Sequence, residues 1–305
     1  MEIFLGLFKN VLEEGFIYGI MAMGVYITYK ILDFPDLSVD GTFPLGACVT
    51  AGLISTGVNP WLACLAAFFC GAGAGCITGL LHVKLRITDL LSGIIVMTAL
   101  WTVDLVVLGQ GDLTGKSLLQ FYNQPTIFTS GPMKLLPAGL YKYRVVLLAF
   151  LIALAVKLTV DWFLRTRTGL LLRSAGDNPQ FVTQLARDQG KMKILGLAIG
   201  NGCTALAGSV LAQQSESASV SIGIGMVVQA LAAVIIGTSM FGRIHILNPT
   251  TMVLLGTLLY KTCLIIAMLK LPSTFLKLTM AILFVAALLT DRVGRKLRRG
   301  GVRHG

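Results

Sequence analysis

Charged residues are scarce in this chain of 305 residues. Asp, Glu, Lys and Arg together make up 13% of the sequence, whereas a soluble domain carries about 25%. The charges are also unevenly spaced, and none occurs between Asp40 and Lys84, between Lys193 and Glu216, or between Glu216 and Arg243. A helix that spans a bilayer needs roughly 20 mostly apolar residues. The scarcity therefore excludes a soluble globular domain and indicates a polytopic, all-α membrane protein.

Motifs for catalysis and nucleotide binding are missing as well. The chain has no GxxxxGK followed by Ser or Thr, no HExxH and no GxSxG, and its three histidines are scattered. The six cysteines lie in apolar runs without a CxxC pair, so we interpret them as packing residues rather than disulfides or metal ligands. We expect no catalytic residue, no metal site and no cofactor in this chain. Energy for active transport would then come from an ion gradient or from a partner protein.

The net charge of +11 would suggest nucleic acid as a partner of a soluble protein. In a membrane protein it more simply records the excess of Lys and Arg in cytoplasmic segments, and we expect no nucleic-acid partner. Residues 165–193 hold six basic and two acidic residues, and the tail 291–305 holds six and one. Placing both in the cytoplasm puts the C-terminus inside, and puts the polar connection 110–142 and the N-terminus outside.

The apolar runs predict a single transmembrane domain over residues 1–305 with about eight or nine spans. Lys9, Glu13 and Glu14 are expected to precede the first one. The expected spans are Phe16–Leu32, Leu45–Thr56, a third that ends near Leu81, Thr88–Gly109, Tyr143–Leu164, Ile194–Ala212, Gly223–Phe241, Ile246–Met268 and Pro272–Leu289.

Residues 33–44 interrupt this pattern, because two prolines, a glycine and three carboxylates cannot form an ordinary lipid-facing helix. Irregular backbone at membrane depth survives only where it is buried in protein or lines a wet cavity. The segment is therefore either a surface loop or a broken helix beside a transport pathway. We name Ser38, Asp40 and Thr42 in this segment as candidate pathway residues.

Uncharged polar residues inside two later apolar runs, Asn201 and Gln229, are further pathway candidates. Hydrogen bonds between helices explain such residues equally well. Asp89 and Asp104 lie within the fourth expected span. They could face the protein interior, lie near the headgroups or, as the only acidic pair available, suggest an intramembrane protease.

Two further patterns concern helix contacts. Gly71, Gly75 and Gly79 recur every four residues, which predicts a face for close helix packing. Lys157 and Asp161 are also four apart, which predicts an ion pair along one helix.

Residues 165–190 form a polar, basic island between apolar runs. Within it, Asn178 followed by Pro179 is typical of a helix start, and the next residues are amphipathic. The short helix either lies on the lipid surface or docks into a groove of another protein.

Several stretches resemble the permeases of ATP-binding-cassette (ABC) importers, in the branched-chain amino acid and ribose-type group. They are GLLLRSAGDNPQF (169–181), KILGLAIGNGCTALAG (193–208), GIGMVVQALAAVIIGTSMFG (223–242) and, more loosely, DLSVDG (36–41). The chain differs from the sugar branch in lacking an extra leading span. It is most similar to amino-acid permeases, including tryptophan and tyrosine systems.

The resemblance implies a permease dimer, either homodimeric or heterodimeric, in the bacterial cytoplasmic membrane. It also implies a cytoplasmic ABC ATPase that binds the ATP and an extracytoplasmic solute-binding protein. The island helix, about Asn178 to Arg187, would be the coupling helix. The residues assigned to the ATPase interface are Arg173, Ala175, Gly176, Asn178, Pro179, Gln180, Phe181, Gln184 and Leu185. A carrier driven by an ion gradient, and an importer of sugar or nucleoside, are the alternatives.

Overall fold

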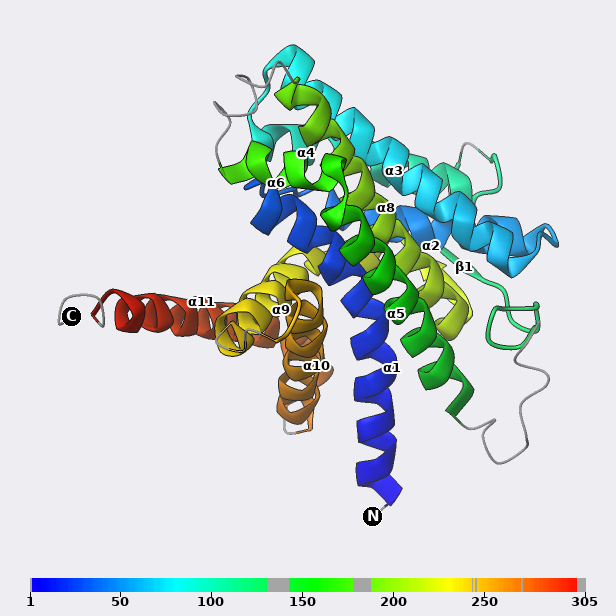
Figure 1. Cartoon of the computed structure of the whole chain (residues 1–305). Coiled ribbons are helices and arrows are strands. Elements are labelled where there is room, and N and C mark those ends of the chain that lie inside the picture. Colours follow the sequence, from blue (N-terminus) through cyan, green and yellow to red (C-terminus); the bar gives the residue numbers. More distant parts are fainter. Residues whose placement is uncertain are drawn as a thin grey trace.

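The computed structural model describes residues 2–112, 114–130, 143–177, 188–242, 244, 246–269 and 271–300. These residues are helical almost throughout, which confirms the predicted class (Figure 1). In chain order the elements are α1 (Glu2–Val25), the π-helical turn η1 (Tyr26–Ile31), α2 (Val39–Ser55), α3 (Pro60–Leu85), α4 (Asp89–Leu108), β1 (Leu118–Gln120), α5 (Arg144–Arg165), α6 (Arg167–Asp177), α8 (Gln189–Ser215), β2 (Ser217–Ser219), the 3₁₀ turn η4 (Val220–Gly223), α9 (Met226–Phe241), α10 (Pro249–Met268), η5 (Ser273–Phe275) and α11 (Leu276–Gly300).

Seven helical segments in the described part of the chain are long and apolar enough to cross a membrane. The helices found at two other expected spans, Leu45–Thr56 and Pro272–Leu289, cover Val39–Ser55 and Leu276–Leu289, and they are apolar but shorter. The nine expected segments are thus all helical, but α2 is too short for a full span because residues 33–38 are not helical.

The first span starts earlier than the sequence predicted. It covers Gly6–Ile31, so Glu13 and Glu14 lie inside it instead of before it. Their charges have partners. Lys9 Nζ lies 3.4 Å from Glu13 Oε1, and Lys261 on α10 places its Nζ 2.9 Å from Glu14 Oε2. Paired charges can be accommodated in a helix where single ones would be costly.

Helix α8 is the centre of the bundle, and α1, α2 and α3 all pack on it (Figure 1). Glycines permit these contacts. The α3 stripe faces α8: a side chain at Gly75 would meet the backbone of Leu197, and one at Gly71 would meet Asn201 and Ala205. The predicted tight contact along this stripe is therefore confirmed. Gly208 of α8 lies in the same way against the Phe43 carbonyl of α2.

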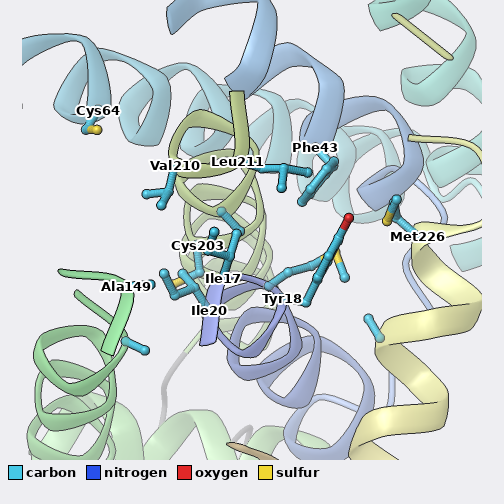
Figure 2. Packing of buried hydrophobic residues seen from close by; sticks show 14 of the residues in the cluster. Ile17, Tyr18, Ile20, Phe43, Cys64, Ala149, Cys203, Val210, Leu211 and Met226 are labelled. Carbon is cyan, nitrogen blue, oxygen red and sulfur yellow. The ribbon is translucent and has the colours of Figure 1, made fainter. Parts of the chain in front are cut away.

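The main core cluster lies between α1 and α8 (Figure 2). Ile17, Ile20 and Cys203 are buried where the two helices meet, and Tyr18 of α1 stacks on Phe43 of α2. The core thus joins the N-terminal helix to the middle of the chain and includes Phe43 of α2.

The connection after α4, whose composition is typical of a loop, contains the short strand β1. Strand β1 pairs antiparallel with β2, with Leu118 opposite Ser219 and Gln120 opposite Ser217. The Ile127 amide also donates a 2.9 Å hydrogen bond to the Gln213 side chain of α8. These bonds attach the connection to the end of α8.

Candidate translocation site

The chain between η1 and α2 is a buried break in the helices rather than a surface loop. Asp33 has a left-handed backbone (φ 54°) and is exposed, but the chain then turns inward. Phe34, Asp36 and Ser38 are 1%, 4% and 0% exposed. Of the two alternatives for residues 33–44, the surface loop is wrong, and the irregular backbone lies within protein, as expected at membrane depth.

A polar network fills the interior of this break. Asp36 accepts hydrogen bonds from the amide and hydroxyl of Ser38, at 2.8 and 2.6 Å. It also accepts one from the side-chain amide of Asn201 on α8, at 2.6 Å. The side-chain oxygen Oδ1 of Asn201 in turn accepts a 2.8 Å hydrogen bond from the Thr42 hydroxyl of α2. The network therefore fixes the start of α2 to the middle of α8.

A second break precedes α9. Strand β2 and the turn η4 lead to Gly225, whose φ of +91° suits glycine, and α9 starts only at Met226. Asp40, in the first turn of α2, accepts bonds from the amides of Gly225 (3.1 Å) and Val227 (2.7 Å). A carboxylate at a helix N-terminus satisfies free amides and complements the helix dipole. The N-termini of two interrupted helices consequently meet.

A cavity of about 260 Å³ lies beside this meeting point. It is lined by Asp40, Gly41, Pro44, Met97, Thr98, Trp101, Asp104 and Ile224. Asp104 of α4 is fully buried, and neither of its oxygens has a hydrogen-bond partner among the described residues. Interrupted helices beside a cavity are the arrangement found at many transporter substrate sites.

The structure brings four of the five sequence-predicted pathway residues together. Ser38, Thr42 and Asn201 form the network with Asp36, and Asp40 lines the neighbouring cavity. Gln229 of α9 is 1% exposed, but its side-chain atoms have no partner in the described part of the chain. It therefore does not join the network, and it does not provide the interhelical hydrogen bond considered above.

Two functional candidates were missed or undervalued. Asp36 could have been found from its spacing, since an Asp two residues before a helix-starting Ser commonly bonds the backbone ahead of it. The sequence singled out Asp104 only together with Asp89, as an acidic pair within one expected span. Both lie on α4, fifteen residues apart, which is about 22 Å along a helix. They cannot form a catalytic dyad.

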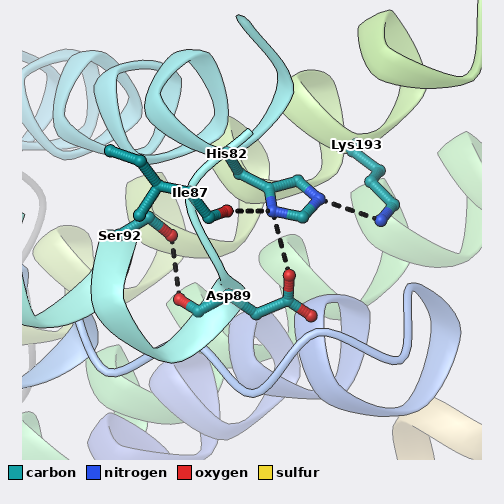
Figure 3. A network of polar contacts seen from close by, with 5 residues as sticks. All are labelled: His82, Ile87, Asp89, Ser92 and Lys193. Carbon is teal, nitrogen blue, oxygen red and sulfur yellow. Dashed lines mark hydrogen bonds and ion pairs between the residues drawn. The ribbon is translucent and has the colours of Figure 1, made fainter. Parts of the chain in front are cut away.

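Asp89 belongs to a separate network at the other end of α4 (Figure 3). His82 Nδ1 lies 2.9 Å from Asp89 Oδ1 and 2.9 Å from the Ile87 carbonyl, and its Nε2 lies 3.0 Å from Lys193 Nζ. The lysine can only donate, so His82 carries its proton on Nδ1 and accepts at Nε2. This network joins the α3–α4 turn to the start of α8, next to the polar island.

The predicted Lys157–Asp161 pair is confirmed, at 3.1 Å. Asp161 also accepts bonds from Thr250 (2.6 Å) and Asn248 (3.1 Å) at the start of α10. The pair is thus part of a contact between α5 and α10 rather than a purely local feature.

The polar island contains one helix that the sequence did not predict, α6. Arg173 is exposed on it and Ala175 is buried. Gly176 lies so close to the Ile31 carbonyl at the end of η1 that no side chain would fit there. Helix α6 is thereby seated on the break between α1 and α2. The remaining interface candidates, Asn178, Pro179, Gln180, Phe181, Gln184 and Leu185, lie outside the described residues.

A family model described as "Branched-chain amino acid transport system / permease component" matches residues 7–289. The chain belongs to this family, so it is a multi-pass membrane permease of the ABC importer group that its sequence resembles.

A tyrosine transport system permease protein of Clostridioides difficile is 38% identical over 291 residues, which cover 95% of this chain and 93% of that protein. An uncharacterized protein of Rickettsia prowazekii is 30% identical, over 75% and 76% of the two chains. The ribose import permease protein RbsC of Escherichia coli is 25% identical, over 76% and 70%. No solved structure shows a significant match.

Proposed function

We propose that this chain is the membrane subunit of an ABC importer that moves an amino acid, with an aromatic one such as tyrosine as the first choice. The single observation that supports the substrate class is the 38% identity, over nearly the whole of both chains, with a tyrosine transport system permease. The similarity to ribose permeases gives weaker support for a sugar as the substrate of this chain, since they match only about three quarters of it at 25% identity.

The transport step follows from the two interrupted helices. Helices α2 and α9 start inside the bundle and are joined by the Asp40 carboxylate at the cavity. A permease needs two arrangements of such elements that open the site to opposite sides of the membrane. We place the pathway along Ser38, Asp40, Thr42 and Asn201, with Gln229 further along α9.

The proposed partners are a cytoplasmic ABC ATPase, an extracytoplasmic solute-binding protein and a second permease copy. We infer that the island and the C-terminus lie on the cytoplasmic side of a bacterial cytoplasmic membrane, and the excess of basic residues in segments 165–193 and 291–305 supports this orientation. Residues 1–305 then act as one permease domain, surrounded by lipid where they do not contact these partners.

The coupling helix is proposed at 178–187, with Arg173, Ala175 and Gly176 leading into it. Its support is the seating of α6: because Gly176 packs directly on the Ile31 backbone, displacement of the island would be transmitted to the break at 33–38. ATP-driven closure of the ATPase could in this way reach the Asp36 network without any nucleotide bound to the permease itself.

Transport by the reconstituted complex tests the function. Proteoliposomes that hold the permease, its ATPase and the binding protein should accumulate labelled L-tyrosine with ATP, and should not do so without the ATPase. Uptake driven by a proton or sodium gradient in vesicles of this chain alone would instead establish the ion-driven carrier.

The coupling helix has its own test. Phe181→Glu should abolish co-purification of the ATPase while membrane insertion stays normal, because it places a charge on the apolar face of the docking helix. Gln180→Ala should weaken the same association. Ser174→Ala, whose hydroxyl bonds the Leu170 carbonyl within α6, is the matched control. Unchanged recruitment in Phe181→Glu would leave the lipid-surface helix as the explanation.

A further inference from the structure

Asp104 and the Asp36 network are two different kinds of buried carboxylate. Asp36 has three donors within hydrogen-bond distance, whereas Asp104 has none among the described residues. Both side chains are nearly or fully inaccessible in this chain. The network explains why Asp36 is present, but nothing in the fold explains Asp104.

An isolated carboxylate inside a membrane protein is expensive to bury unless a cation or a proton neutralises it. No Lys, Arg or His of the described residues forms an ion pair with Asp104. Asp104 is one of the residues that line the cavity between α2 and α4. The missing positive charge can therefore be supplied by a molecule in that cavity.

The other carboxylate at the cavity, Asp40, is already engaged. Its two oxygens accept the amides of Gly225 and Val227, so its charge is directed to the N-terminus of α9. Thr98 likewise uses its hydroxyl on the Ile94 carbonyl, at 2.8 Å. Among the side chains that line the cavity, Asp104 is the acidic group left for a ligand.

The remaining walls are apolar or aromatic. Met97 and Trp101 of α4 and Ile224 before α9 line the cavity, and Trp101 is 45% exposed. An indole face accommodates apolar and aromatic groups and also attracts cations. A volume of about 260 Å³ lies just below the usual range of about 300–1,000 Å³ for small-molecule pockets, which suits one small solute.

We propose that the cavity between α2 and α4 is a substrate subsite in which Asp104 binds the ammonium group of the amino acid in transit, while Trp101 and Met97 contact its side chain. The proposal rests on the proposed function, because it specifies where the imported amino acid is held. It assigns Asp104 to ligand binding, and leaves Asp36 as a positioning residue for α2.

Uptake by variants of the full complex is the first measurement. Asp104→Asn should lower ATP-driven uptake of L-tyrosine at least tenfold, and Asp104→Glu should restore part of it, since only the charged group can pair with an ammonium ion. The matched control is Ser92→Ala on the same helix, which is equally buried but bonds only the Asp89 carbonyl; it should transport within twofold of wild type. Assembly and basal ATP hydrolysis should be equal in all four proteins.

Infrared difference spectra of the wild-type permease in nanodiscs are the second measurement, and they do not depend on ATP. Adding L-tyrosine or L-leucine should change a carboxyl band that is missing in Asp104→Asn. The deaminated analogues of both amino acids should leave this band unchanged.

Each outcome is decisive. The subsite proposal is wrong if uptake by Asp104→Asn stays within twofold of wild type. It is also wrong if the carboxyl band of the wild-type protein does not change when amino acids are added, or changes equally with the deaminated analogues. An Asp104→Asn complex that loses its second permease copy would show that a neighbouring chain, not substrate, neutralises the carboxylate. If the wild-type complex shows no ATP-driven uptake, the proposed function is wrong, and the subsite is then tested by the infrared measurement alone.

Discussion

The two halves of the bundle share an order of elements but differ in how they hold their interrupted helix. A long helix, an interrupted helix and then a helix that starts with Asn-Pro follow one another twice, as α1, α2, α3 and as α8, α9, α10. The packing is reciprocal, because α3 lies on α8 and α10 lies on α1. The long helices run in opposite directions, with Gln214 near Glu13 and Gly200 near Gly24.

The difference lies in the breaks. Before α2, side chains hold the backbone: Asp36 binds Ser38 and reaches Asn201 of the opposite half. Before α9, no carboxylate of the segment itself contributes, and the helix start is held by Asp40 from the first half. The second break thus depends on the first, and a movement at residues 33–38 would reach α9 through Asp40.

The largest loss of stability is expected from a substitution in the Asp36 network, which holds the first break. Asp36→Ala removes the acceptor of the buried Ser38 amide and of one Asn201 N–H, and leaves the Ser38 hydroxyl only its 3.2 Å bond to the Asn201 side chain. This should lower the free energy of unfolding by about 3 kcal/mol. The change is measured by SDS-induced unfolding in mixed micelles. Asp33→Asn is the control, because Asp33 is exposed and asparagine tolerates its positive φ. Adding Asn201→Ala to Asp36→Ala should cost less than the sum of the two; full additivity would contradict a shared network.

A smaller loss is expected where the two halves cross. Gly208→Ala would place a methyl group against the Phe43 carbonyl, and overpacking of this kind costs about 1–3 kcal/mol. Gly73→Ala on α3 meets nothing within 4 Å and should stabilise its helix by up to about 1 kcal/mol. The thermal midpoints of the two variants should move in opposite directions, and equal shifts would show that α2 and α8 are not in close contact.

The smallest effect tests the dependence of the second break on the first. Asp40→Asn removes the charge at the start of α9 and weakens two backbone bonds, for an expected cost of about 1 kcal/mol. Amide hydrogen exchange should become faster at residues 225–228, and by less at the start of α2, because residue 40 lies in the first turn of that helix. Thr98→Val, which also borders the cavity, should leave both regions unaffected. Unchanged exchange at 225–228 in Asp40→Asn would show that α9 holds its own start.

Much of the molecule follows from local patterns. The helical segments were predictable because the apolar runs are long and the charges that separate them are clustered. The glycine stripe on α3 and the Lys157–Asp161 pair were predictable because both follow helical periodicity. The break at 33–44 was visible from its prolines and carboxylates, while the one before α9 was not, because Ser, Gly and Ile at 217–225 look like the continuation of an apolar span.

By itself, then, the sequence determined which segments are helical, which face of α3 packs closely and, through the family match over 7–289, what kind of protein this is. Only the tertiary structure decided that Asp36 meets Asn201, 165 residues away, that Asp40 holds the start of α9, and that Asp104 has no hydrogen-bond partner among the described residues. The reason is physical: helix formation depends on neighbours three or four positions along the chain, whereas the cost of a buried carboxylate depends on groups that reach it from other helices.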